Sequence, residues 1–342
     1  MKEIGSEFWE IDLDNHNNNL DFLKIGMDQK LLMSGRTAID FVLGDFNDVK
    51  KIVYMPDYCC KSMVKPFIDN EYSIIYYHVD LESGTYDIDK EINCSIFFAM
   101  NYFGYKTSNM DEFISSFSKR NVIVIEDITH RLMSTTNYCQ KSDYLIGSLR
   151  KWFPIISGGV AIKVSSKFNN SIDNYIVDES FVNTKLKAME IKKKYMEGYI
   201  DSKDEFLQLY KDSNECFLNY KNKKIDDISL NILKSININK IRLRRISNCL
   251  LIEKKLNNNK KIKLLFRYTN GDCPLFVPVL IENRNEIRRR LIEKRIYLPV
   301  HWSDNDLDNK IYNMEISLIN DQRYLEKDIE QYIDELVKIV GE

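Results

Sequence analysis

Residues 121–163 read NVIVIEDITHRLMSTTNYCQKSDYLIGSLRKWFPIISGGVAIK and contain the pattern that decides the fold. A short apolar run rich in β-branched residues ends at Asp127, a second run ends just before Lys151, and a third follows the pair Gly158-Gly159. Runs of this length and composition are typical of buried strands in parallel sheets. The stretch therefore predicts neighbouring strands that hold Asp127 and Lys151 above the same edge of one sheet.

The same pattern extends toward the N-terminus. Strand-like runs at 52–55, 72–80 and 94–104 alternate with helical patterns at 62–70 and 109–118. Alternation of this kind predicts an α/β fold, in which a mainly parallel sheet carries helices on its faces. In such sheets, ligands bind at the carboxyl ends of the strands.

The second half of the chain has a different composition. Residues 167–222 are charged and helical in character, and we interpret them as a helical arm or lid. A long helical pattern over 225–256 leads into a C-terminal part with strand-like runs at 261–268, 274–281 and 295–302. We therefore predict a large domain over 1–224 and a linker helix with a smaller α+β domain over 225–342.

Composition excludes several classes of protein. The formal net charge of −2 gives no reason to expect a nucleic-acid binder. The seven cysteines are scattered without metal-ligand spacing and the four histidines lie far apart, so neither a disulfide framework nor a metal site is predicted. No apolar run approaches the ~18 residues that cross a bilayer. We expect a reduced, cytoplasmic protein that binds no membrane.

The acid and the lysine of the central stretch suggest a specific chemistry. An enzyme that uses pyridoxal phosphate (PLP) needs a lysine to form an imine with the cofactor aldehyde and to move a proton. It also needs a carboxylate on the pyridine nitrogen, so that the ring can take up electrons. Lys151 and Asp127 are the candidates for these two roles. Taken alone, Asp127 has a competing interpretation as a helix N-cap and Lys151 as a surface residue.

A helix start near residues 34–37 is the candidate phosphate site. The first turn of a helix presents unpaired N–H groups, which together with hydroxyls suit a phosphate. Ser148, three residues before the lysine, can add another hydroxyl. The competing interpretation of the helix start is an ordinary N-cap. The predicted phosphate ligands are Ser34, Gly35, Arg36, Thr37 and Ser148.

Other residues are expected around the cofactor ring. His130 lies three residues after Asp127, where it can touch the ring or its phenolic oxygen, or brace the carboxylate. Tyr58 and Cys60 are candidates for the other face of the ring, with core packing as the alternative. Asn101 ends a neighbouring strand and falls at the same edge of the sheet.

Five short motifs follow one another along the chain: SGRTAI, MPDYCC, NYFG, IEDITH and SLRKW followed by GG. In this order they resemble the DegT/StrS family of sugar aminotransferases. The resemblance covers residues 30–165 well and continues more weakly through the C-terminal part. It implies the fold type I architecture of the PLP enzymes, assembled as a homodimer whose active sites use both chains.

The resemblance implies roles for individual residues. Lys151 is the Schiff-base lysine, Asp127 the partner of the pyridine nitrogen, His130 its neighbour, and 34–37 the turn that cradles the phosphate. The chain departs from the family at Arg36, where a threonine is commoner, and at Cys60, where many relatives carry the aromatic ring that stacks on PLP. The segment before Lys151 is also shorter than usual. These departures indicate a divergent branch.

Members of the family usually move an amino group from glutamate or glutamine to a nucleotide-linked keto-sugar, for amino sugars of surface polysaccharides or secondary metabolites. The sequence therefore predicts an aminotransferase with PLP, an amino-acid donor and a nucleotide sugar as its partners. One alternative is a PLP-dependent sugar dehydratase, in which a histidine replaces the lysine. Another is a non-catalytic relative that binds a sugar nucleotide. His301, Trp302 and Tyr297 are further residues that can approach the pocket.

Overall fold

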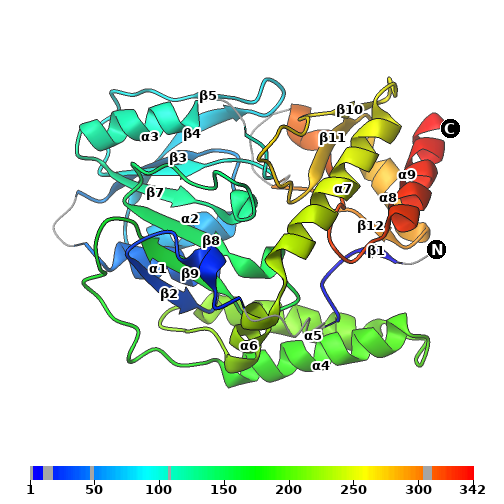
Figure 1. The fold of residues 1–342 in the computed structure, drawn as a ribbon, viewed down its shortest axis with the longest axis horizontal. Coiled ribbons are helices and arrows are strands. Elements are labelled where there is room, and N and C mark those ends of the chain that lie inside the picture. The colour runs from blue at the N-terminus through cyan, green and yellow to red at the C-terminus, as the bar shows by residue number, and fades with distance from the viewer. Residues whose placement is uncertain (1–2, 11–17, 47–49, 107–108, 303–309) are drawn as a thin grey trace.

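A sheet of eight strands forms the body of the protein (Figure 1). The computed structural model describes all residues except 1–2, 11–17, 47–49, 107–108 and 303–309. The strand order is β2-β9-β8-β7-β6-β3-β4-β5, and the run from β8 to β4 is parallel. This confirms the predicted α/β class. The strands are β2 (Asp28–Leu32), β3 (Ile52–Pro56), β4 (Ser73–Asp80), β5 (Thr85–Asp87), β6 (Ile96–Met100), β7 (Ile123–Asp127), β8 (Tyr144–Ser148) and β9 (Gly159–Lys163).

The central strands are apolar on both sides because helices cover both faces of the sheet. Along β6, Ile96 and Phe98 pack with α1 (Gly35–Leu43) and α2 (Lys61–Asp69). The alternate residue Phe97 packs with α3 (Met110–Lys119) on the other face. Successive side chains of a strand point to opposite faces, so a strand buried on both faces has no polar alternation.

The helical arm is shorter than its composition suggests. Helices α4 (Glu179–Met196) and α5 (Asp204–Glu215) pack against each other below the body in Figure 1, but residues 167–178 contain no helix. Asp178 ends this irregular segment by capping α4, since its side chain accepts the N–H of Phe181.

The predicted long helix over 225–256 is in fact two helices, α6 (Asp227–Ser235) and α7 (Ile238–Leu256). The chain is extended at Ile236 and Asn237 between them. The side chain of Asn237 accepts the N–H of Lys240 and so begins a new helix. A local cap therefore overrides an apolar pattern that runs on without a break.

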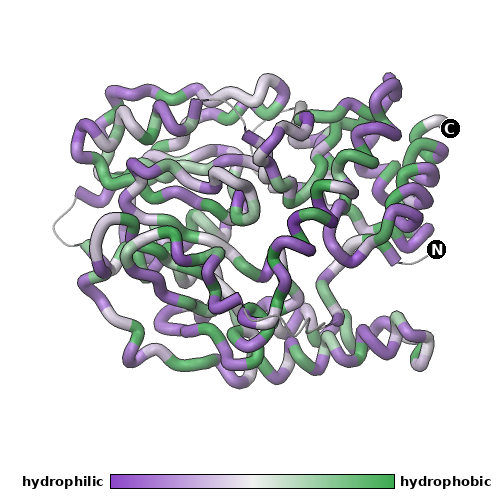
Figure 2. The backbone as a smooth tube through the Cα atoms, viewed as in Figure 1, coloured by the Kyte–Doolittle hydropathy of each residue, from purple (hydrophilic) through white to green (hydrophobic). Residues whose placement is uncertain are grey.

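The C-terminal part contains a three-stranded antiparallel sheet and two helices. The strands are β10 (Ile262–Leu264), β11 (Val277–Ile281) and β13 (Glu315–Leu318), and the helices are α8 (Arg284–Glu293) and α9 (Glu326–Gly341). Figure 2 shows apolar and polar segments alternating along α9, which buries one face. No helix in the described part of the chain is long and apolar enough to cross a membrane.

The run at 295–302 contains a shorter strand than the sequence pattern predicts. Only β12 (Ile296–Tyr297) is a strand, and it pairs with β1 (Ile4–Gly5) near the N-terminus. The two backbones approach so closely that a Cβ on Gly5 would lie 1.9 Å from the carbonyl oxygen of Tyr297. Gly5 also has φ +83°, a conformation that glycine adopts without strain.

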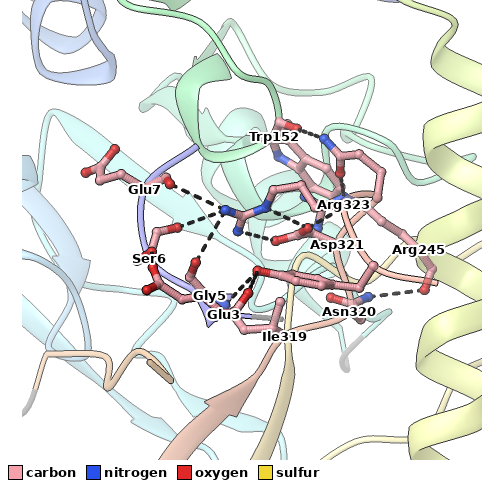
Figure 3. Close-up of polar contacts among 12 residues, drawn as sticks. Glu3, Gly5, Ser6, Glu7, Trp152, Arg245, Ile319, Asn320, Asp321 and Arg323 are labelled. Atoms are coloured by element: carbon pink, nitrogen blue, oxygen red, sulfur yellow. Dashed lines mark hydrogen bonds and ion pairs between the residues drawn. The ribbon is translucent and has the colours of Figure 1, made fainter. Parts of the chain in front are cut away.

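Two neighbouring residues, Arg323 (labelled in Figure 3) and Tyr324, hold the N-terminal segment against the C-terminal part. The Arg323 guanidinium pairs with Asp321 at 2.6 Å and donates to the carbonyl oxygens of Gly5, Ser6 and Glu7. The Tyr324 hydroxyl accepts the N–H of Gly5 at 2.8 Å and donates to the Glu3 carbonyl oxygen at 3.1 Å. The N-terminal segment is therefore an integral part of the fold.

Candidate active site

The carboxyl ends of β7 and β8 bring three predicted residues together. Asp127 is the last residue of β7, His130 follows it, and Lys151 ends the short 3₁₀ turn after β8. The Lys151 Nζ lies 3.4 Å from the His130 Nε2. Asp127 is 5% exposed and His130 is fully buried. This arrangement agrees with the edge of the sheet that the sequence predicts.

Thr129 holds the Asp127 carboxylate in place. It accepts the backbone N–H of Thr129 at 2.7 Å. Burial raises its pKa, while hydrogen bonds from Thr129 and the charge of Lys151 oppose that rise. A buried carboxylate whose pKa is raised is stabilised in its ionised form most strongly by a cationic partner that donates a hydrogen bond to it.

Thr129 and Trp152 fix the loop that carries Lys151, and neither was predicted. The Thr129 hydroxyl accepts the N–H of Ser148 at 2.9 Å, and the Trp152 Nε1 donates to the Thr129 carbonyl oxygen at 2.6 Å. The Trp152 carbonyl oxygen in turn accepts from Gln322 at 2.7 Å. These bonds tie the segment after β7 to the segment after β8. A tryptophan directly after the lysine was the available signal, but its partner cannot be read from spacing.

Lys151 can be reached by a ligand, and the pKa of its amine is lowered. Its side chain is exposed by surface area, so a ligand can reach it. Protein atoms crowd around the amine nevertheless, and this partial desolvation lowers its pKa, against the opposing charges of Cys60 and Asp127. A lysine with a lowered pKa is deprotonated more often and is a better nucleophile.

His130 is neutral and carries its proton on the ring nitrogen that lies nearest to the lysine. Its Nδ1 accepts the backbone N–H of Phe103 at 2.9 Å, which leaves the single proton of the neutral ring on Nε2. Burial and the charge of Lys151 lower the His130 pKa well below its usual value, so the ring stays neutral. Trp302 stacks parallel to it, with ring centroids 5.8 Å apart, and the Lys151 Nζ lies 6.0 Å from the Trp302 ring.

The hydroxyls of the predicted phosphate turn are bonded within the protein. Ser34 caps α1 by accepting the N–H of Thr37 at 3.2 Å, as the N-cap interpretation requires. The Thr37 hydroxyl donates to the Tyr220 carbonyl oxygen at 3.0 Å. Arg36 points toward the segment after α5, where it donates to the Phe217 carbonyl oxygen. A role for these three side chains at a phosphate stays a prediction.

The start of α1 nevertheless lies beside the loop that carries the lysine. An ideal Cβ on Gly35 would lie 3.4 Å from the Ser148 Cβ, and one on Gly159 only 2.1 Å from the Ser34 carbonyl oxygen. Gly159 is therefore a glycine because the first turn of α1 rests directly on β9. The helix N-terminus and Ser148 together form one polar corner of the site.

Asn101 presents an unused donor. It is 2% exposed, and its Nδ2 has no hydrogen-bond partner among the described residues. An orphaned buried amide costs about 1–3 kcal/mol, which a ligand acceptor would recover.

Tyr58 and Cys60 lie in different surroundings. Tyr58 is fully buried, stacks on Tyr312 at 4.8 Å and meets Trp302 edge-on at 4.6 Å. Cys60 is half-buried, with its Sγ 2.5 Å from the Ser62 hydroxyl, and it lies close enough to Lys151 for their charges to interact. Besides the His130 imidazole, the aromatic ring that contacts the lysine amine is therefore that of Trp302, at 6.0 Å, with Tyr58 behind it.

Comparison with known proteins identifies the fold. No protein-family model and no curated protein sequence matches the chain. Helicobacter pylori PseC, an aminotransferase involved in the biosynthesis of pseudoaminic acid, is similar over 100% of both chains, with a TM-score of 0.71 and 12% identity. A DegT DnrJ EryC1 StrS aminotransferase from Brucella abortus matches 93% of this chain and 87% of its own, with a TM-score of 0.63 and 12% identity. NtdA from Bacillus subtilis, solved with bound cofactor PMP, matches 93% and 74%, with a TM-score of 0.62 and 13% identity. The chain therefore has the fold type I architecture of the DegT/StrS-type sugar aminotransferases, as its motifs predict.

Proposed function

We propose that this protein is a PLP-dependent aminotransferase that transfers an amino group from glutamate or glutamine to a nucleotide-linked keto-sugar. The observation that carries the proposal is the juxtaposition of Lys151, His130 and Asp127 at one strand edge of this fold. PLP supplies an electron-accepting ring that carries the amino group between the two substrates.

The residues of the site fit this cofactor by their chemistry. Asp127 is a buried carboxylate that a cationic partner would stabilise, and it would hold the proton on the ring nitrogen. Lys151 offers a reachable amine of lowered pKa, which would bind the cofactor and move protons at its Nζ. The His130 Nε2–H and the unpaired Asn101 amide are donors for the ring oxygen. Both donors are neutral, so they can bind the anionic oxygen of the ring without placing a positive charge next to the Asp127 carboxylate.

For the phosphate, we propose the first turn of α1 with Gly35 and Ser148. Ser34 and Thr37 would act by shaping that turn, since their hydroxyls already bond within the protein. Tyr58 and Cys60 stay candidates for the surroundings of the ring. Helix N-termini bind phosphate through unpaired N–H groups, so the proposal does not need the Arg36 side chain.

The finer parts of the proposal follow from the family resemblance. They are the nucleotide sugar as acceptor, a homodimer that shares its active sites, a place in amino-sugar or polysaccharide synthesis in the cytoplasm, and a large domain over 1–224 with a smaller one over 225–342. A biosynthetic role is supported by the similar protein PseC, an aminotransferase involved in the biosynthesis of pseudoaminic acid.

Cofactor binding and transamination are tested in one series. Purified protein titrated with PLP should gain visible absorbance that saturates near one PLP per chain, and Lys151→Ala should abolish it. Lys187→Ala is a matched control, because this lysine lies on the exposed surface of α4.

The loaded protein is then mixed with glutamate and a panel of nucleotide keto-sugars. An aminated sugar supports the proposal. Loss of a hydroxyl without gain of an amine indicates a dehydratase, and the absence of PLP binding indicates a non-catalytic relative.

A further inference from the structure

A buried chain of hydrogen bonds ends at a second histidine of the site. The Glu315 carboxylate on β13 accepts the Ser317 hydroxyl at 2.6 Å, and the same hydroxyl oxygen lies 3.0 Å from the His301 Nδ1. Glu315 also accepts the backbone N–H of His301 at 3.0 Å. Glu315 and Ser317 are fully buried, and His301 is 8% exposed. The imidazole is therefore fixed from the C-terminal sheet.

The direction of these bonds determines the tautomer of His301. Both carboxyl oxygens of Glu315 accept hydrogen bonds, Oε1 from the Ser317 hydroxyl and Oε2 from the His301 N–H, so the Ser317 proton points to Glu315. The Ser317 oxygen must then accept, and in the neutral form of the His301 ring the proton lies on Nδ1. The His301 Nε2 is left with a free lone pair, and no described residue hydrogen-bonds to it.

His301 and His130 are thus chemically opposite. His130 keeps its proton on Nε2, because Nδ1 is occupied by the Phe103 N–H. The two ring centroids lie 6.1 Å apart, and both rings contact Trp302, which lies 6.0 Å from the Lys151 Nζ. The site therefore has one imidazole that carries its proton on Nε2 and contacts the lysine, and a second imidazole, packed against the first, whose Nε2 can accept a proton. A buried structural histidine would explain the Ser317 bond, but it would not need a second nitrogen without a hydrogen-bond partner among the described residues, in a ring that packs against His130 and Trp302.

We propose that His301 is a catalytic base that deprotonates the incoming amine donor, an inference that rests on the function proposed above. An amino acid arrives as an ammonium ion, whose nitrogen has no lone pair with which to react. An N–H bond of the ammonium breaks, its electron pair stays on the nitrogen, and the proton bonds to the His301 Nε2. The ring becomes a cation, which the Glu315 carboxylate 3.7 Å from Nδ1 stabilises. When the aminated product leaves, the same proton returns to it, so the cycle balances.

Ser317 and Glu315 are positioning residues in this scheme, since they set the tautomer of His301 and compensate its charge. The charged and titratable groups around His301 are Glu315, Arg284 at the start of α8, His130 and Tyr58, whose hydroxyl donates to the His301 carbonyl oxygen at 3.4 Å. Lys151 lies beyond Trp302. His130 cannot serve as the base, because its pKa is lowered well below the usual value and its Nε2 is already protonated.

The tautomer is tested on the resting protein by ¹⁵N NMR of labelled histidines. The chain contains four histidines, and His301→Asn identifies the signals of interest by their loss. We expect the wild-type signals of a ring protonated at Nδ1, and Ser317→Ala should shift them toward the other tautomer. Wild-type signals that show the proton on the His301 Nε2 would overturn the proposal. This measurement needs no cofactor and no substrate.

The catalytic role is tested on the PLP-loaded protein by stopped-flow absorbance with glutamate alone. His301→Asn should bind PLP normally but slow the donor half-reaction by about 10²–10⁴-fold, the range of general base catalysis. The difference in rate between wild type and His301→Asn should become smaller as pH rises, because more of the glutamate is then already a free amine and needs no catalytic base. Ser317→Ala and Glu315→Gln should show a smaller defect of the same pH dependence. Equal rates for wild type and His301→Asn at every pH would refute the role. A wild-type protein that binds no PLP contradicts the proposed function instead, while the NMR result still stands.

Discussion

Replacing Gly159 by alanine tests whether the contact between α1 and β9 organises the site. The new Cβ would lie 2.1 Å from the Ser34 carbonyl oxygen and 2.8 Å from the Gly35 nitrogen. That carbonyl oxygen accepts the N–H of Ala38, the first hydrogen bond of the helix. Both obstacles are backbone atoms, so no side chain can rotate away, and the whole turn must move.

The expected cost follows from this geometry. Extra atoms forced into a packed interior typically destabilise by about 1–3 kcal/mol. Alanine in a strand recovers about 0.5–1 kcal/mol of conformational entropy relative to glycine. Because the obstacle is rigid, we expect a net loss of about 2 kcal/mol. PLP affinity should fall as well, since the displaced turn is the proposed phosphate site.

Urea unfolding and PLP titration of Gly159→Ala measure the two effects. Gly341→Ala is the matched control, because nothing lies within 4 Å of the added Cβ at that position. Stability equal to the control within about 0.5 kcal/mol would mean that α1 does not rest on β9 as described. Lost stability with unchanged PLP affinity would mean that the turn does not bind the phosphate.

Three further substitutions probe the rest of the site. Asp127→Asn should weaken PLP binding by about 10- to 100-fold in an absorbance titration, since a neutral amide loses a charge-assisted bond worth about 1.5–3 kcal/mol; unchanged affinity would exclude its pairing with the ring nitrogen. Trp152→Phe should cost about 1–3 kcal/mol in urea unfolding, because the Thr129 carbonyl oxygen loses its donor, and wild-type stability would show that this bond does not secure the loop. Burial raises the pKa of Glu126 to about 7, so the folded state binds its proton more tightly than the unfolded chain, and stability should fall as pH rises from about 4.5 to 7. Glu126→Gln should remove this fall, a gain of at most about 3 kcal/mol at pH 8 and little at pH 5, whereas an equal effect at both pH values would contradict the shift.

The positions of Asp127 and Lys151 at one edge of the sheet could be predicted, because they depend on residues that are close together in the sequence. Each strand of the body is a short β-branched run, and Asp127 and Lys151 follow two such runs directly. Once the strands are parallel, geometry alone brings their carboxyl ends together. The same reasoning placed Asn101 correctly at the end of β6.

Features that depend on partners distant in sequence could not be predicted. The proton position on His130 is set by the backbone N–H of Phe103, which no side-chain pattern reveals. The run at 295–302 pairs with β1 because backbones meet there, not because its composition differs from that of other strands. The direction of Arg36 is likewise decided by Phe217 in a segment whose composition indicates only a charged helical region.

The pairing of β1 with β12 has a consequence for synthesis on the ribosome. The body sheet has all of its strands once Lys163 has been made, but Ile4 must wait for Ile296. At about 5–20 residues per second, synthesis from Ile4 to Ile296 takes roughly 15–60 s, and synthesis from Lys163 to Ile296 takes roughly 7–27 s. During the second of these intervals the N-terminal strand has an unpaired backbone while the body is already able to fold. The charged residues that flank it, Glu3 and Glu7, would keep this waiting segment from adding to the edge of another chain.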